Sequence, residues 1–490
     1  MCLMNFIDNQ WLPGKGTEFH SINPANEEII WTGNASSETD VDAAVQAAHK
    51  SFSSWRQLPL QQKNEIFERF KEFIERDKES FARLISDESG KPFWECLTEV
   101  GAMIGKLAIS LNAYEQRCKE NSKEMPGNSH SATRWRAIGP MAVFGPFNLP
   151  VHLPNGHIIP ALIAGNTVVF KPSEQTPACA QKMVELWHEA GLPAGVINLV
   201  QGSRDTGMAL TTHRQIKGVL FTGSYTTGVA IHQALAGKPE VILALEMGGN
   251  NPLLVWDAKD LQAAAYTIVQ SAFITSGQRC VCARRLIIPK GEYGDTLIKE
   301  LLNISNCIRV GLPRDKEEPF MGPLISKASA NNMLEAQQEL LNRGATSLLE
   351  MKQLSASHAL LTPGVIDVSN LSHRNDHEYF GPLLQVIRVS TFEEAISEAN
   401  NTAFGLSAGL ICDTKKTYQH FFNQCSAGII NWNRQITGAS SAAPFGGSGK
   451  SGNFRPGASL AADYCAYPVA SIESPIVEIP AQLPPGITIT

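Results

Sequence analysis

From residue 137 onward, the chain alternates short apolar runs with longer amphipathic stretches. The runs have the length of strands and are rich in β-branched and aromatic residues; they fall at 141–144, 167–170, 196–200 and 218–221. Stretches of helical length separate them, which is the pattern of a doubly wound parallel sheet with helices on both faces. A second series of the same kind begins near residue 251 and continues to about residue 430. The pattern therefore predicts an α/β protein with two successive sheets.

The N-terminal part of the chain follows a different pattern. Residues 6–33 contain short strand and turn signals. A helix is predicted from about Asp40 and a longer one from about Leu60 into the 80s, because apolar residues recur there at helical intervals. Residues 121–136 are polar and then β-compatible, which is typical of an excursion from the main body. The tail after Tyr467 is rich in proline and apolar residues, and we expect it to contact a partner chain.

Composition indicates a large globular protein and excludes several functional classes. The 490 residues correspond to roughly two large domains or three smaller ones. A hydrophobic share of 43% and a charged share of 18% are ordinary for a protein with a large core. The net charge of −6 gives no basic excess for nucleic acid or an anionic membrane. No apolar run approaches the ~18 residues of a membrane span, and residues 1–8 lack the features of a signal peptide.

The cysteines point to a reducing compartment. Ten cysteines at irregular spacing are typical of reduced thiols rather than of a disulfide framework. Cys280 and Cys282 are too close for a redox pair and have no companion pair that would hold zinc. We therefore expect a cytoplasmic protein with no metal, no nucleic-acid partner and no membrane contact.

Cys280 lies at the end of a small, polar turn, residues 273–280, rather than in an apolar run. Glu246 lies upstream in an equally unusual setting that is rich in glycine and asparagine. A thiolate adds to a carbonyl carbon, and a carboxylate activates the water that later hydrolyses the adduct. Taken alone, however, Cys280 is also consistent with an inert core thiol, and Glu246 with a buried ion-pair partner.

Two segments resemble parts of a dinucleotide site. Residues 219–228 are a strand, a glycine turn at Gly223 and the start of a helix, whose N-terminal N–H groups would face a pyrophosphate. Lys171 and Glu174 follow the strand at 167–170, where both can bond ribose hydroxyls. A carboxylate there also repels a 2′-phosphate, which favours NAD over NADP. An ordinary βα turn and a surface loop capped by Ser173 are the alternative interpretations.

Asn148 follows a predicted strand in a turn with two prolines. Its amide is suited to donate to a developing oxyanion, with the Cys280 backbone N–H as the second donor. A purely structural turn asparagine is the alternative. His152 and His157 suggest a cysteine hydrolase, but nothing else in the chain resembles one, and loop residues are the simpler interpretation.

Together, these segments resemble the aldehyde dehydrogenase superfamily over nearly the whole chain. The matching segments are 146–148, 171–174, 221–224, 246–250, 277–280, 378–382 and 444–449. The resemblance implies that Cys280 is the nucleophile, Glu246 the base and Asn148 the oxyanion donor. It also implies NAD as the cofactor, with contacts from Lys171, Ser173, Glu174, Gly223, Ser224, Tyr225, Thr226, Thr227, Gly228, Glu378 and Phe380.

The resemblance also implies a domain organisation. We expect residues 1–120 and 137–247 to form a Rossmann-type NAD-binding domain, 248–432 a second α/β catalytic domain, and 121–136 with 466–490 a small β extension for oligomerisation. At least a homodimer follows from the resemblance, with a homotetramer as the larger possibility.

Three further segments, 152–157, 431–441 and 461–468, resemble a narrower branch whose members oxidise an anionic semialdehyde in arginine catabolism. Val281, Phe454 and residues 457–460 depart from the expected pattern, which concerns the shape of the substrate mouth. An anionic aldehyde requires cations, and the candidates are Arg117, Arg279, Arg434 and Arg455, each of which is also consistent with an ordinary ion pair. Another semialdehyde dehydrogenase and a cofactor-independent cysteine hydrolase are the alternatives; a CoA-acylating enzyme is disfavoured because Glu246 is present to activate water.

Overall fold

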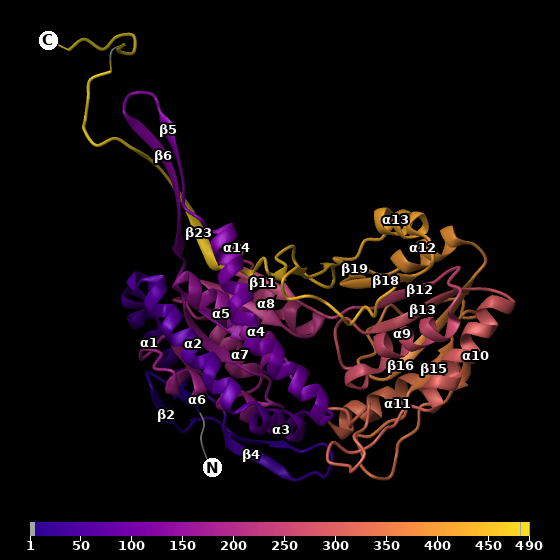
Figure 1. The fold of residues 1–490 in the computed structure, drawn as a ribbon. Helices are drawn as coiled ribbons and strands as arrows, with labels where there is room; N and C mark the ends of the chain where they lie inside the picture. Colours follow the sequence, from indigo (N-terminus) through magenta and orange to yellow (C-terminus); the bar gives the residue numbers. More distant parts are fainter. Residues whose placement is uncertain (1–4, 481, 490) are drawn as a thin grey trace.

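The computed structural model describes residues 5–480 and 482–489. Our predictions for residues 1–4, 481 and 490 lie outside the described residues; they concern the outermost ends of the expected NAD-binding domain and oligomerisation segment. Figure 1 shows two sheet-containing lobes side by side, with a hairpin that projects away from the first lobe.

The first sheet has seven strands in the order β11-β10-β7-β8-β9-β1-β2. Its strands are β1 (Asn5–Ile7), β2 (Gln10–Leu12), β7 (Pro140–Phe144), β8 (Thr167–Lys171), β9 (Ile197–Leu199), β10 (Gly218–Thr222) and β11 (Ile242–Glu246). The strands from β11 to β9 are parallel, whereas β1 and β2 extend the sheet antiparallel. Strands β7 and β8 are buried along their whole length, as expected of a parallel sheet covered on both faces. The four strands predicted between residues 141 and 221 are confirmed.

Helices cover this sheet on both faces. They are α1 (Glu38–Gln57), α2 (Leu60–Arg76), α3 (Lys78–Ser89), α4 (Phe93–Arg117), α5 (His152–Ala164), α6 (Pro177–Glu189), α7 (Arg204–Thr212) and α8 (Tyr225–Leu235). The single long helix predicted from Leu60 into the 80s is wrong, because it is two helices that meet at Asp77. The Asp77 carboxylate accepts hydrogen bonds from Arg76 at 2.8 Å and from Lys182 on α6 at 2.7 Å, which fix the break.

The second sheet also has seven strands, in the order β14-β15-β16-β13-β12-β18-β19. They are β12 (Asn251–Val255), β13 (Ala283–Pro289), β14 (Thr346–Leu349), β15 (Gly364–Asp367), β16 (Leu383–Val389), β18 (Ser407–Ile411) and β19 (Ile429–Trp432). The helices of this lobe are α9 (Leu261–Phe273), α10 (Glu292–Asn306), α11 (Lys327–Asn342), α12 (Phe392–Asn400) and α13 (Lys415–Gln424). Every neighbouring pair is parallel except β14 and β15.

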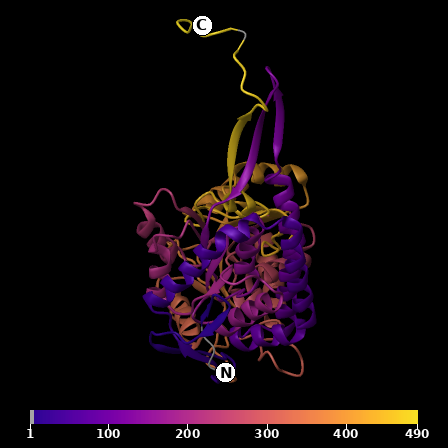
Figure 2. The same ribbon diagram turned by 90° about the vertical axis from the view of Figure 1, so that its left-hand side faces the viewer.

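A three-stranded arm and several two-stranded ribbons complete the molecule. The arm consists of β5 (Asn121–Met125), β6 (Ser129–Ala137) and β23 (Ala466–Glu473), and β23 pairs with β6 over eight residues. Figure 2 shows that the arm rises above the body, with the C-terminal segment beyond it. The ribbons and a short helix are β3 (Glu18–Ile22), β4 (Ile29–Asn34), β17 (Phe404–Gly405), β20 (Pro444–Phe445), β21 (Ser448–Gly449), β22 (Gly457–Ala458) and α14 (Ala461–Cys465).

The described part of the chain has neither a helix suited to span a membrane nor a cluster of metal-ligating side chains. Across residues 5–480 and 482–489, no helix combines the length and the apolar character that crossing a membrane requires. Nor do three or more histidine, cysteine, aspartate or glutamate side chains of these residues gather in an arrangement suited to a metal ion.

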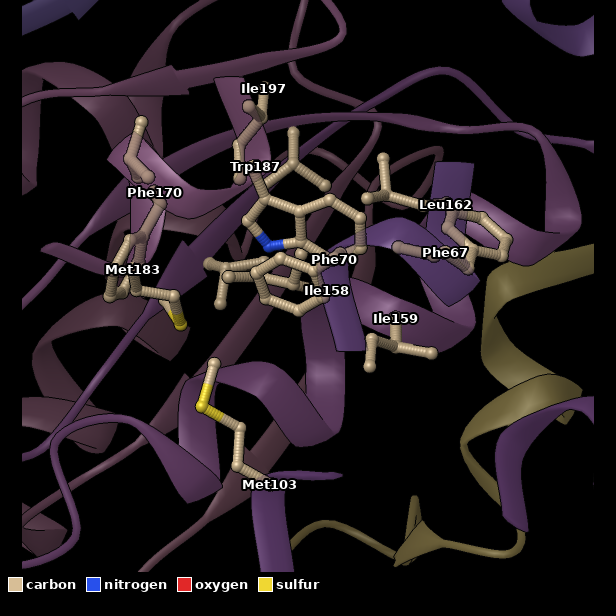
Figure 3. Packing of buried hydrophobic residues seen from close by; sticks show 14 of the residues in the cluster. Phe67, Phe70, Met103, Ile158, Ile159, Leu162, Phe170, Met183, Trp187 and Ile197 are labelled. Carbon is tan, nitrogen blue, oxygen red and sulfur yellow. The ribbon is translucent and has the colours of Figure 1, made fainter. Parts of the chain in front are cut away.

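Aromatic packing holds the helices of the first lobe against its sheet. Trp187 of α6 stacks on Phe70 of α2, with ring centroids 3.5 Å apart and planes 11° from parallel. Phe67 meets the same indole edge-on at 5.9 Å. Figure 3 shows this cluster, which also contains Met103 of α4 and Ile158 of α5. Because these rings are fully buried, their contacts join four helices into one core.

We expect Trp187→Ala to lower the free energy of unfolding by about 3–5 kcal/mol, because the substitution leaves a large cavity in a close-packed core. The measurement is the midpoint of urea-induced unfolding, with the dependence of the unfolding free energy on urea concentration unchanged. Tyr266→Ala is the control, since Tyr266 is 57% exposed on α9, and its effect should stay within about 0.5 kcal/mol. A loss for Trp187→Ala no larger than that of the control would contradict the packing described above.

Candidate active site

A cleft of about 1400 Å³ is lined by residues from both lobes. On one side it meets the last residues of four parallel strands, Phe144, Lys171, Thr222 and Glu246, so it lies at the sheet edge where α/β proteins bind ligands. The predicted site residues that line it are Asn148, Lys171, Ser173, Glu174, Gly223, Ser224, Tyr225, Thr226, Thr227, Glu246, Cys280, Glu378 and Phe380.

Cys280 is presented by a turn of unusual backbone conformation. Thr275 and Ser276 have φ values of 55° and 50°, and Gly277 follows with a φ of 73°. Gly277 admits no side chain, because a Cβ there would lie 2.1 Å from the carbonyl oxygen of Gly381. Asn251 donates to the Cys280 carbonyl at 2.7 Å, which fixes the backbone of the thiol. The described cysteines are all free, and Cys280 lines the cleft.

The Cys280 thiol is held in its neutral form. Burial, followed by the charges of Glu378 and Glu246, raises the pKa of this thiol to about 12. Arg284 acts in the opposite direction, with the smaller effect. The resting thiol is therefore a weak nucleophile, and it becomes reactive only when its surroundings lose negative charge or gain positive charge.

Glu246 ends strand β11 in a pocket formed by glycines. Its Oε1 accepts a hydrogen bond from the Gly457 backbone N–H at 3.1 Å, while its Oε2 is buried with no partner among the described residues. A Cβ at Gly446 would lie 2.9 Å from Oε1, so glycine leaves room for the carboxylate. Burial raises the pKa of Glu246 well above its usual range. A carboxylate with a raised pKa and a free oxygen is suited to take a proton from water.

Asn148 is fixed from two sides. Its side-chain amide donates to the Gln278 carbonyl at 2.9 Å, which links it to the turn that carries Cys280. The backbone carbonyl of Asn148 accepts a hydrogen bond from the Lys91 ammonium at 2.8 Å. Lys91 also pairs with Glu99, a buried carboxylate that accepts the N–H of Val151 at 3.0 Å. The sequence motifs gave no indication of Lys91 and Glu99; the available signal was a lysine just before the start of α4 and a glutamate in its second turn.

The cofactor side of the cleft fits a dinucleotide. Ser224 caps helix α8 by accepting the N–H of Thr227 at 3.2 Å, and the N–H groups before Thr227 have no acceptor within the helix. These N–H groups and the buried Lys171 ammonium form a donor set suited to a pyrophosphate and a ribose. Lys171 donates to the Pro172 carbonyl at 2.8 Å and lies 3.9 Å from the half-exposed Glu174.

Glu378 approaches the same cleft from the second lobe. Its carboxylate accepts the N–H of Gly249 at 3.1 Å, and burial raises its pKa. A Cβ at Gly248 would lie 1.7 Å from Oε2 of Glu378, so only glycine permits this approach. Gly228 was also predicted as a cofactor contact, but it does not line the cleft. Its lack of a side chain lets α8 pack on Met247, because a Cβ at Gly228 would lie 2.3 Å from the Met247 sulfur.

None of the four predicted arginines lines the cleft. Arg117 pairs with Asp463, and Arg279 binds Glu95 at 2.8 Å, so these two guanidinium groups already have carboxylate partners. Arg434 and Arg455 are exposed and form no ion pair with any described residue. Arg455 lies two positions before Gly457, the residue that contacts Glu246.

The histidines do not form a hydrolase pair with Cys280. His157 lies 3.1 Å from the Thr222 hydroxyl through Nε2 and 3.2 Å from the Tyr464 hydroxyl through Nδ1. Burial lowers the pKa of His157 to about 4. Both ring nitrogens therefore serve the packing of α5, and no described contact joins this ring to the thiol.

Comparisons with known proteins identify the family of the chain. Residues 11–467 match the model of the aldehyde dehydrogenase family. The chain is 51% identical to N-succinylglutamate 5-semialdehyde dehydrogenase of Pseudomonas fluorescens, over 98% of this chain and 99% of that protein. The enzyme of the same name from Ectopseudomonas mendocina is also 51% identical, over 99% of each chain.

Solved structures share the fold. An NAD-dependent aldehyde dehydrogenase from Sinorhizobium meliloti has a TM-score of 0.91 and 27% identity, over 98% of this chain and 96% of that chain. An NADP-dependent glyceraldehyde-3-phosphate dehydrogenase from Bacillus halodurans has a TM-score of 0.90 and 27% identity, over 97% and 99%. A Rossmann-like α/β lobe with a second α/β lobe is thus confirmed, and the chain belongs to the aldehyde dehydrogenase family.

Proposed function

We propose that the protein oxidises N-succinyl-L-glutamate 5-semialdehyde to N-succinyl-L-glutamate with NAD, in the succinyltransferase pathway of arginine degradation. Two relatives that are 51% identical over nearly their whole length carry the name of this activity. The observation that carries the proposal is that Cys280, Glu246 and Asn148 line one cleft, with the Glu246 carboxylate buried and half unpartnered.

The proposed reaction begins at the thiol. Cys280, as its thiolate, adds to the aldehyde carbon and forms a thiohemiacetal. The oxyanion of this adduct accepts hydrogen bonds from the side-chain amide of Asn148 and the backbone N–H of Cys280. A nicotinamide dinucleotide held at Lys171, Glu174 and the N-terminus of α8 would supply the hydride acceptor, and loss of hydride from the adduct would leave a Cys280 thioester. Glu246 then takes a proton from water, the hydroxide displaces the thiol, and the carboxylate product leaves.

The preference for NAD rests on Glu174. This side chain is 52% exposed at the end of β8 and lies beside Lys171. In the proposed pose it bonds the ribose hydroxyls of the cofactor, and its charge repels a 2′-phosphate. Both NAD-dependent and NADP-dependent relatives share this fold, so the choice depends on such local charges rather than on the architecture.

We also propose a cytoplasmic homodimer or homotetramer in which the arm contacts another subunit. Strand β23 and the segment after it carry exposed apolar side chains, namely Tyr467, Ile472, Ile476, Val477 and Ile479. Exposed apolar residues concentrated on a protruding sheet are typical of an interface between subunits.

The exposed Arg455, close to the Glu246 pocket, remains a candidate for a substrate carboxylate, as does Arg434.

The first prediction concerns substrate choice. With NAD, we expect kcat/KM for N-succinylglutamate semialdehyde to exceed that for succinate semialdehyde, γ-aminobutyraldehyde and neutral aldehydes by at least about tenfold, because the additional carboxylates add binding energy. NADP should support slower turnover, and Glu174→Gln should narrow the difference between the cofactors. The measurement is the increase in absorbance of the reduced cofactor. Absence of cofactor reduction with every aldehyde would overturn the proposed activity.

A second prediction separates acylation from deacylation. Cys280→Ala should abolish turnover while NAD still binds, because no covalent adduct forms. Glu246→Gln should retain a burst of about one equivalent of reduced cofactor and lose about 10²–10⁴-fold in the steady state, since no base activates the water. Stopped-flow absorbance measures both phases. Glu292→Gln, an exposed position on α10, is the matched control; an unchanged steady state in Glu246→Gln would remove that residue from the base role.

A third prediction concerns the resting thiol. A pKa of about 12 means that the thiolate fraction of Cys280 rises about tenfold per pH unit between pH 7.5 and 10. In the cofactor-free enzyme, alkylation of Cys280 by iodoacetamide should follow that rise without a plateau. Peptide mass spectrometry reads each cysteine separately, and the exposed Cys307 serves as the internal reference. A plateau below pH 9 would show that the thiol is already activated at rest.

A further inference from the structure

Helix α4 buries three charged side chains on one face, Glu95, Glu99 and Lys106. The two carboxylates already have cations of their own: Glu95 binds Arg279, and Glu99 binds Lys91. Neither is free to neutralise Lys106. This lysine is 2% exposed, and its ammonium makes no hydrogen bond or ion pair with any residue among 5–480 and 482–489. Burial alone lowers its pKa to about 8.

An isolated ammonium in such a place is costly, because burial removes water without supplying a counter-charge. A second buried lysine shows how the fold otherwise meets this cost. Lys63 of α2 is 4% exposed, and its ammonium lies 5.2 Å from the centre of the Trp55 ring, which stabilises the cation. Lys106 has no aromatic ring of this kind among the described residues, so its stabilisation has to come from elsewhere.

The side chain of Lys106 reaches toward the first turns of α5. Its Cε lies 3.7 Å from where a Cβ of Gly156 would be, so the lysine stem runs along the space that a side chain at position 156 would occupy. Gly156 itself is partly exposed. His152 lies one helical turn earlier, on the same face as Gly156.

His152 also lacks a partner. Its Nδ1 is buried with no hydrogen bond to any described residue. Burial, followed by the charges of Lys106, Arg279 and Lys91, lowers the pKa of His152 to about 4, so its ring is neutral and carries one N–H. An ammonium without a counter-charge, beside an imidazole without a hydrogen-bond partner at Nδ1, forms a site that is complementary to an anion.

This pair adjoins the reactive centre along the chain. Helix α5 begins four residues after the oxyanion donor Asn148, and Leu153, next to His152, lines the cleft that contains Cys280. Arg279, whose charge acts on His152, is the chain neighbour of Cys280. Lys106 and His152 do not line the cleft themselves; they adjoin its lining at Leu153, and neither Glu246 nor Glu378 is among the charges that act on them.

We propose that Lys106, assisted by His152, binds a carboxylate of the aldehyde substrate. The ammonium donates to the carboxylate, and the N–H of His152 adds a second donor. This inference rests on the proposed oxidation of an anionic semialdehyde, and it assigns the charge recognition to a lysine that our sequence analysis did not consider. The polar atoms Ser110 Oγ and Asn155 Oδ1, buried without partners on the same two helices, define the alternative, a lysine solvated by internal water.

The test compares an anionic with a neutral aldehyde in matched variants. In Lys106→Met, kcat/KM for N-succinylglutamate semialdehyde should fall about 10- to 100-fold, mainly through KM, while kcat/KM for hexanal and the KM for NAD change less than about threefold. Lys106→Arg should recover part of the loss, because it restores the charge. Lys63→Met removes a comparably buried cation far from the cleft and should leave the ratio between the two aldehydes unchanged.

A second readout does not depend on turnover. The product N-succinylglutamate should bind wild-type enzyme in calorimetry and bind Lys106→Met at least about tenfold more weakly. Equal losses for both aldehydes, or unchanged binding of N-succinylglutamate, would show that Lys106 is only structural. If the wild type instead prefers a different anionic aldehyde, the proposed substrate is wrong. The effect of Lys106→Met is then measured with that aldehyde against hexanal. If the wild type does not discriminate between anionic and neutral aldehydes, both proposals fail.

Discussion

Burial of a thiol and two carboxylates in one cleft is the constraint on which the site depends. Cys280, Glu246 and Glu378 each have a raised pKa, and burial is the largest cause in each case. Two of these side chains are held by backbone N–H groups, those of Gly457 and Gly249, rather than by strong cations. A full ion pair would fix Glu246 as a carboxylate of low basicity. The weaker N–H contacts leave it able to accept a proton.

That arrangement requires space for the carboxylates, and glycine provides it. A Cβ at Gly248 would collide with the Glu378 carboxylate, and one at Gly446 would crowd Glu246. Gly277 has a different role, because its left-handed φ and its contact with the Gly381 carbonyl turn the chain so that Cys280 lines the cleft. The glycines of the sequence motifs are therefore explained by close approach and backbone conformation, and each one couples the two lobes or the loops between them.

The sequence predicted the periodic and motif-based features well and the long-range ones poorly. Strands β7, β8 and β10 could be predicted because buried parallel strands are continuous apolar runs. The break at Asp77 could not, because it depends on Lys182, which is distant in the sequence. The arginine candidates show the same limit: their motif positions could be read from the chain, but the partners Asp463 and Glu95 could not. Lys106 lies in none of the sequence motifs, and only the structure shows that its buried ammonium has no partner among the described residues.

The distribution of charge across the cleft connects these observations. Glu246 and Glu378 place negative charge at the cleft wall, whereas Lys106, behind the cleft lining at α5, is a cation that is not neutralised. If Lys106 has the proposed role, an aldehyde with a carboxylate at its far end is repelled by Glu246 and Glu378 and attracted to Lys106, which favours one orientation of its carbonyl carbon toward Cys280. The same repulsion keeps such a carboxylate away from Glu246, the proposed base. Under the proposed roles, the lysine that orients the substrate is thus separated from the carboxylates that surround Cys280, and the two kinds of charge do not neutralise each other.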